Sequence, residues 1–146
     1  MKIAFVIRHV GEETDVIQKL AMVLVEHFKS VGDTVTVFPF TRYSLFKPFP
    51  RRKLKEYDAI VISNVGLQCA YYCFFKKIGF THKPFVAISF GSDIRQKNNR
   101  WINLFNKLSV KQINLLIVIN PDLIELAKER GYKNVKYVPT WSEAIV

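Results

Sequence analysis

The 146-residue sequence contains few cysteines and no long uncharged apolar run. Its two cysteines, Cys69 and Cys73, lie four residues apart, and no Cys-x-x-Cys motif accompanies them. This usage predicts reduced thiols in a cytoplasmic protein rather than a disulfide framework. A membrane-spanning helix requires about 18 apolar residues, and no uncharged apolar run is that long. The apolar run after Met1 stops at Arg8, which is too soon for a signal peptide. We therefore expect a cytoplasmic protein, free or held peripherally on a membrane surface.

The motifs of several enzyme classes are also missing. The loop after the first apolar segment, RHVGEET, has one glycine where a dinucleotide site has Gly-x-Gly-x-x-Gly. Neither a phosphate-binding P-loop nor the Gly-x-Ser-x-Gly turn of serine hydrolases occurs. The three histidines, His9, His27 and His82, are scattered, with no second ligand at metal spacing. We accordingly expect neither a metal nor a cofactor.

Acidic residues are scarce, and their scarcity is local. The chain has 22 Lys and Arg against 12 Asp and Glu, a net charge of +10. Residues 34–121 hold fourteen of the basic residues and three of the acids, namely Glu56, Asp58 and Asp93. The positive electrostatic field of this cation excess attracts polyanions, anionic lipid headgroups or pyrophosphates. The alternative is that these cations only keep the surface hydrated.

Six short apolar segments separated by helical patterns predict the fold class. The predicted strands are residues 2–8, 34–39, 58–63, 83–90, 115–119 and 135–138. Their alternation with helices is typical of an α/β protein, and it predicts a doubly wound, mainly parallel six-stranded sheet with helices on both faces. The length fits one Rossmann-like domain over residues 1–146.

Besides a helix start after Ser92, three helices are predicted between these strands. The first starts near Thr14 and ends at Gly32, and the last has Pro121 at its first position and ends at Gly131. The middle one covers residues 66–79, and spacing predicts that its core side carries Leu67, Ala70, Tyr71, Phe74, Phe75 and Ile78. On the other side lie Cys69, Tyr72, Cys73 and Lys76, for which membrane contact is the alternative to core packing.

The segment 40–56 interrupts the alternation with aromatic residues, two prolines and cations. Aromatic rings among cations suit a membrane interface or stacked single-stranded nucleic acid. The alternative is that the rings cover the core while the cations face water. The candidate contacts for a membrane or polyanion are Arg42, Lys47, Arg51, Arg52 and Lys53.

A candidate anion site follows the fourth predicted strand. After the buried run comes the turn Gly91-Ser92-Asp93, and then Arg95, Lys97 and Arg100, which are expected to carry no neutralising acid. Helix-start amides with cations at a strand's carboxyl end form an anion site, although an ordinary strand-to-helix connection has the same pattern. The same edge of the sheet should collect the candidate binding residues Arg8, Gly11, Glu12, Asn64, Gly91, Ser92 and Arg95.

Four fragments, in order, carry a resemblance that covers nearly the whole chain. They are GEETDVIQKLAMVLVEHFKSVGDTVTV, EYDAIVISN, KPFVAISFGSD and NLLIVINPDLIELAKERGYKNVKYVPT. Together they resemble the N-terminal domain of GT-B glycosyltransferases similar to family 4. The resemblance implies that this chain binds the acceptor, a sugar or lipid-linked molecule, while a second domain or partner subunit binds the nucleotide-sugar. No donor-binding half is present in the sequence.

The resemblance also assigns roles to single residues. It makes Asp93 the candidate for an acid-base or hydroxyl-binding role, with a helix N-cap as the alternative. The family's double glycine is replaced by Gly11-Glu12, and its histidine before Gly-Ser-Asp by Phe90. Asn64 stands in place of a further histidine. These departures imply that the chain is not active alone.

Two other classes of function remain open. A non-catalytic basic domain that binds anionic membranes or nucleic acid is the second choice, although no recognised motif supports nucleic acid. A flavin-binding protein of flavodoxin type is the third.

Overall fold

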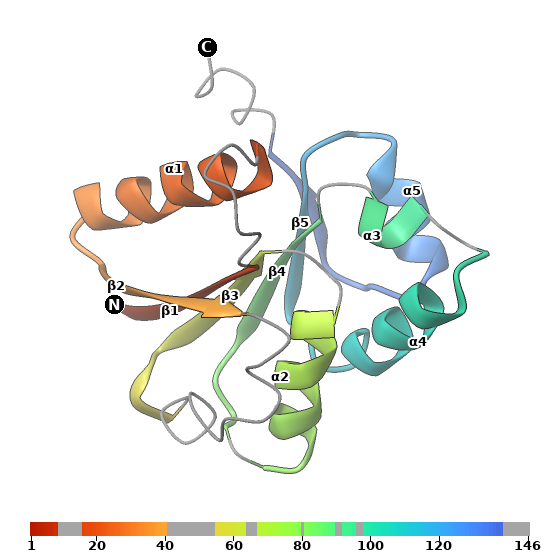
Figure 1. The fold of residues 1–146 in the computed structure, drawn as a ribbon, viewed down its shortest axis with the longest axis horizontal. Helices are drawn as coiled ribbons and strands as arrows, with labels where there is room; N and C mark the ends of the chain where they lie inside the picture. Colours follow the sequence, from red (N-terminus) through yellow and green to blue (C-terminus); the bar gives the residue numbers. More distant parts are fainter. Residues whose placement is uncertain are drawn as a thin grey trace.

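The computed structural model describes residues 1–8, 16–40, 55–63, 67–79, 81–89, 92–95 and 98–138. Strands and helices alternate along these ranges (Figure 1). The strands are β1 (Lys2–Arg8), β2 (Thr34–Phe40), β3 (Ala59–Ser63), β4 (Phe85–Ser89), β5 (Leu115–Val118) and β6 (Val135–Tyr137). The helices are α1 (Val16–Ser30), α2 (Leu67–Lys77), α3 (Ser92–Arg95), α4 (Arg100–Ser109) and α5 (Leu123–Glu129).

The strands form one six-stranded sheet in the order β2-β1-β3-β4-β5-β6, and every neighbouring pair is parallel. The predicted fold class is therefore confirmed. The chain first winds outward from β1 to β2 and then continues on the other side of β1 from β3 to β6. The direction of winding thus reverses between β1 and β3, and this reversal is where doubly wound sheets bind ligands.

Helices cover both faces of the sheet, as Figure 1 shows. On one face, Val25 of α1 packs with alternate residues of β1, such as Ile3 and Phe5. On the other face, α2 and α5 pack over the remaining residues of the strands, such as Ala4 and Ile60. Alternate strand residues thus point into two separate apolar clusters, which explains why the strands read as continuous apolar runs.

The predicted core side of α2 is wrong in part, whereas core packing rather than membrane contact is confirmed for Cys69, Tyr72 and Cys73. Cys69, Tyr72 and Cys73, assigned to the opposite side, are fully or almost fully buried, whereas Phe74 and Ile78 are exposed. Ala70 and Phe75 are buried as predicted. The small side chains of Cys69, Ala70 and Cys73 allow α2 to approach the alanine-containing strands closely, and the bulky Phe74 and Ile78 then remain outside.

The predicted start of the last helix is wrong, and its predicted end is right. Pro121 is not its first residue, because the amides of Leu123 and Ile124 bond to the carbonyls of Asn120 and Pro121, and α5 begins only at Leu123. Its predicted end is confirmed. The amide of Gly131 bonds to the carbonyl of Lys128, and Gly131 has φ of 100°, a conformation that favours glycine.

Helix α4 was not predicted as a separate element. It packs against α2 and α3 rather than lying directly on the sheet. Asn99 caps its N-terminus, because the side-chain oxygen accepts hydrogen bonds from the amides of Trp101 and Ile102 at 3.0 and 3.2 Å. Among the described residues, no helix has both the length and the apolar character needed to cross a membrane.

Candidate functional site

The candidate site lies where β1, β3 and β4 end. The sheet register places Ile7 beside Ser63 and Ser63 beside Ile88, so the three strands end at almost the same level. Because all strands are parallel, the chain leaves each of them at the same edge. This carboxyl edge includes the reversal between β1 and β3, so it is the part of the fold best placed to hold a ligand.

Helix α3 places Ser92 and Asp93 at this edge. Ser92 and Asp93 begin α3 just after the end of β4. The helix is anchored at Ile94, whose side chain is fully buried and whose carbonyl accepts a 2.8 Å hydrogen bond from Nε of Arg130. Another nitrogen of the same guanidinium bonds to the side chain of Asn103 on α4 at 2.8 Å. Arg130 therefore joins α3, α4 and α5 and fixes α3 at the carboxyl edge.

Arg95 has an acidic partner that the sequence did not suggest. Its Nη2 lies 2.6 Å from a carboxylate oxygen of Asp122, which precedes α5. The expectation that Arg95 has no neutralising acid is therefore wrong. Since β4 and β5 are neighbours, the segments that follow them are also neighbours, and residues 27 apart in sequence can pair. An anion that binds Arg95 would have to compete with Asp122, so the net attraction at this point is weaker than the sequence implied.

The structure brings part of the predicted site together. Arg8 ends β1, and Ser92, Asp93 and Arg95 belong to α3, so all four lie in segments at the carboxyl edge. The other predicted binding residues, Gly11, Glu12, Asn64 and Gly91, lie outside the described residues. The same holds for the predicted membrane or polyanion contacts, which are Arg42, Lys47, Arg51, Arg52 and Lys53.

Two buried serines at this edge were missed by the sequence reasoning. Ser63 and Ser89 are the last residues of β3 and β4, and both are fully buried. The alternation of neighbouring residues between the two apolar clusters places Ser63 on the α1 face and Ser89 on the α2 face. A polar residue at the end of an apolar run, or one residue before it, was the available signal. The interior of the sheet thus becomes polar at the level of the candidate site.

Among the groups that the structure describes, the most strongly perturbed ionisable ones lie elsewhere. Sγ of Cys73 is 3.9 Å from Sγ of Cys69, and this hydrogen bond together with burial raises the pKa of the Cys73 thiol. Burial lowers the pKa of Lys76, whose Nζ donates to the carbonyl of Gln112 at 2.9 Å and to Oδ1 of Asn114 at 2.6 Å. Lys76 thereby joins α2 to the turn before β5, at the opposite edge of the sheet from the candidate site.

Metal-binding side chains do not gather in the described ranges, where no group of three His, Cys, Asp or Glu residues is placed to hold an ion. The candidate site therefore consists of strand ends, the start of α3 and a cation-acid pair. Such an arrangement can bind hydroxyl groups and anions through hydrogen bonds and charge.

The fold and the position of the site define a doubly wound, Rossmann-like α/β protein with a candidate ligand site at the carboxyl edge of its sheet. Comparison with protein-family models and with curated proteins finds no match to this chain.

Proposed function

We propose that this chain is the acceptor-binding half of a glycosyltransferase that transfers a sugar from a nucleotide-sugar to a lipid-linked or glycan acceptor. The donor-binding half would come from further sequence or from a partner subunit. One observation carries the proposal: three of the four resembling fragments each contain at least one whole strand of the sheet, in chain order. EYDAIVISN contains β3, KPFVAISFGSD contains β4 and the start of α3, and the last fragment contains β5, α5 and β6.

The position of Asp93 supports a role for it in holding an acceptor hydroxyl. Asp93 belongs to α3, which starts at the carboxyl edge, and it is the one acidic residue between Asp58 and Asp122 in the sequence. In the proposed role its carboxylate accepts a hydrogen bond from the acceptor hydroxyl and takes up the proton when the oxygen attacks the donor sugar. Because the donor lies on the other half, the chain binds acceptor without turning it over.

Acceptor binding by the isolated chain tests this function. The probe is a water-soluble, short-chain prenyl diphosphate carrying N-acetylglucosamine, titrated into isotopically labelled protein and followed by NMR. We expect shifts concentrated in residues at the ends of β1, β3 and β4. Asp93→Asn should weaken binding roughly tenfold to hundredfold, because a hydrogen bond to a charged group contributes about 1.5–3 kcal/mol.

Glu125→Gln supplies the matched control, because Glu125 is an exposed acid on α5. Its affinity for the probe should remain that of the wild-type chain. The proposal fails if the sugar-bearing probe binds no better than the prenyl diphosphate alone, or if Asp93→Asn and Glu125→Gln bind equally well. Nucleic acid gains no support as a partner, since residues 41–54, most of the segment 40–56 that suggested it, lie outside the described residues.

A further inference from the structure

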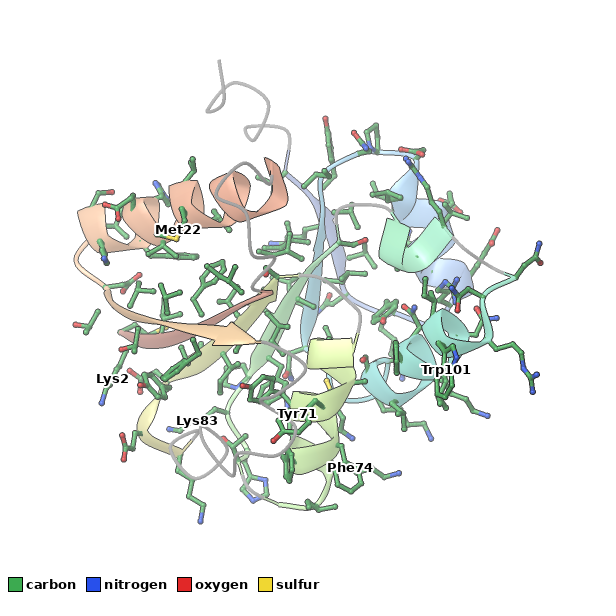
Figure 2. The ribbon with its side chains drawn as sticks, viewed as in Figure 1. Lys2, Met22, Tyr71, Phe74, Lys83 and Trp101 are labelled. Carbon is green, nitrogen blue, oxygen red and sulfur yellow. The ribbon has the colours of Figure 1, made fainter. Side chains whose placement is uncertain are left out.

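Two neighbouring helices expose large apolar side chains to solvent. On α4, Trp101 is 69% exposed, and Leu104 and Leu108 are also exposed. On α2, Phe74 is 49% exposed, and Ile78, which directly follows α2, is 54% exposed. The two helices pack against each other, and Figure 2 shows Phe74 at α2 and Trp101 at α4, on the same side of the sheet. We call these five side chains, with the exposed cations among them, the α2–α4 surface.

A helix that only covers a core buries its apolar side and exposes its polar side, whereas α4 does the opposite. Its most buried residues are polar, namely Asn106 and Ser109. Asn106 accepts a 2.8 Å hydrogen bond from the hydroxyl of Tyr132 and donates one of 2.9 Å to the carbonyl of Ile102. The hydroxyl of Ser109 donates to the carbonyl of Phe105 at 2.8 Å. Core packing therefore accounts for the polar side of α4 but not for the apolar side that faces water.

Cations accompany the exposed apolar residues, and acids do not. Neither α2 nor α4 contains an acidic residue. Residues 67–118 include eight Lys and Arg and one acid, Asp93. The exposed cations on these two helices are Lys77, Arg100 and Lys107, and Lys111 follows two residues after α4. A tryptophan and aliphatic side chains surrounded by lysine and arginine match the interface of an anionic membrane, where rings and alkyl groups enter below the headgroups and cations pair with lipid phosphates.

We infer that the α2–α4 surface docks this protein on an anionic membrane. Charge decides between a membrane and a second copy of the chain. A symmetric dimer through this surface would bring the same cations of two copies together, without an acid on either helix to pair with them. An anionic lipid surface instead neutralises the cations and accepts the apolar side chains.

This inference is independent of the proposed glycosyltransferase function, and it differs from the sequence prediction, which assigned membrane contact to residues 40–56. The two proposals are nevertheless compatible in space. Trp101 lies in the first turn of α4, a few residues after α3 at the carboxyl edge. Docking through Trp101 would hold that edge near the membrane, where a lipid-linked acceptor resides.

Tryptophan fluorescence with vesicles tests the docking directly. The chain has two tryptophans, Trp101 and Trp141, so Trp141→Phe leaves Trp101 as the one reporter. With vesicles of phosphatidylcholine and phosphatidylglycerol in equal parts, we expect a blue shift of the emission and quenching by brominated acyl chains. With phosphatidylcholine alone both effects should be weak, and added salt should reduce them in the anionic vesicles.

Matched variants separate the apolar and the charged contributions in vesicle co-sedimentation. Trp101→Ala combined with Leu108→Ala should lower the affinity for the anionic vesicles at least about tenfold, because binding scales with the apolar area buried. Lys107→Glu combined with Lys111→Glu should also lower it at least about tenfold, at about 1 kcal/mol for each lysine near the surface. All four side chains are exposed, so thermal unfolding should change little.

The control variants change the same residue types on other elements. Met22→Ala combined with Val31→Ala alters exposed apolar residues on and after α1, where Figure 2 shows Met22 across the sheet from α2. Lys29→Glu combined with Lys136→Glu reverses two exposed charges on α1 and β6. Both controls should bind the vesicles as the wild-type chain does, apart from the general effect of net charge on the second.

Three outcomes overturn the inference. The first is equal binding to neutral and anionic vesicles, or no binding to either. The second is a Trp101 signal that brominated lipids do not quench. The third is a dimer in sedimentation velocity that Trp101→Ala with Leu108→Ala abolishes while vesicles leave the emission unchanged, which would assign the surface to a second copy of the chain.

Discussion

At the scale of single residues, burial on the inner side of α2 determines the reactivity of its two cysteines. Cys69 and Cys73 are fully buried with their sulfur atoms 3.9 Å apart, and the pKa of Cys73 is raised by its hydrogen bond to Cys69 and by burial. A thiol rather than a thiolate is therefore the form present at neutral pH, and thiols are poor nucleophiles. We interpret the pair as packing residues that contribute no redox chemistry.

The raised pKa of Cys73 predicts a loss of stability in alkaline solution. Above about pH 9 an unfolded chain loses the thiol proton, whereas the folded chain retains it. The unfolded state then binds fewer protons, so the free energy of unfolding falls by about 1.4 kcal/mol per pH unit for this one group. Urea unfolding at several pH values from 7 to 10 should show this slope in the wild-type chain and a shallower one in Cys73→Ala.

Lys76 contributes with the opposite sign, because burial lowers its pKa and an unfolded chain then binds the additional proton. Lys76 is present in both proteins, but Cys73 also acts on its pKa in the raising direction, so its contribution cancels only in part when Cys73→Ala is compared with the wild-type chain. Parallel stability curves for the two proteins between pH 8 and 10 would contradict the assignment.

At the scale of elements, the starts of α4 and α5 differ although both follow a good capping residue. Asn99 bonds to two backbone amides at the start of α4. Asp122 precedes α5 without a side-chain cap bond, because its carboxylate instead pairs with Arg95. The same type of side chain thus stabilises a helix at one place and joins two helices at the other.

This difference predicts that alanine substitution lowers the free energy of unfolding by unequal amounts at Asn99 and Asp122. Asn99→Ala should lower the free energy of unfolding by about 1 kcal/mol, since two amides lose their acceptor, and Asn99→Asp should change it little. Asp122→Ala should cost less than about 0.5 kcal/mol, because both members of its ion pair are exposed. Chemical denaturation measures all three, and equal losses at the two positions would contradict the capping assignment.

At the scale of the whole molecule, stability should be greatest in the middle of the sheet. β1, β3 and β4 have a partner strand on each side, while β6 has three residues and pairs with β5 alone. Two hydrogen bonds of equal length allow a direct comparison. The amide of Ile60 donates to the carbonyl of Pro84 at 3.1 Å in the middle of the sheet, and that of Val138 donates to the carbonyl of Val118 at 3.1 Å beside β6.

Amide hydrogen exchange should distinguish these two bonds. We expect the Ile60 proton to exchange at least roughly a hundredfold more slowly than the Val138 proton, because its opening requires disruption of the central strands. The comparison is made by NMR on the intact chain in native buffer. Similar protection at both sites would mean that the sheet opens as one unit.

The strands were predictable because parallel strands are buried on both faces and so appear as continuous apolar runs. The segments 2–8, 58–63 and 115–119 agree within one residue at either end with β1, β3 and β5. The side of α2 was not predictable from spacing. Apolar residues occur around most of that helix, and the fit of Cys69 and Cys73 against the strands decided which side turned inward.

Part of the candidate site was predictable for the same reason. The ends of apolar runs locate the carboxyl edge, so the positions of Arg8, Ser92 and Asp93 followed from the sequence. The partner of Arg95 did not follow, because Asp122 approaches it through the adjacency of β4 and β5. Likewise, apolar residues at helical spacing indicate a helix, but they do not show which side of α4 meets water.

The sequence alone determined where the strands lie along the chain, their burial on both faces, and the local excess of positive charge. These features depend on residues that are close together in the chain. The tertiary structure decided the side of α2 in the core, the pairing of Arg95 and the exposure of Trp101, Leu104 and Leu108 on α4. These features depend on contacts between segments that are distant in sequence, and close packing in three dimensions selects among faces that local periodicity leaves equivalent.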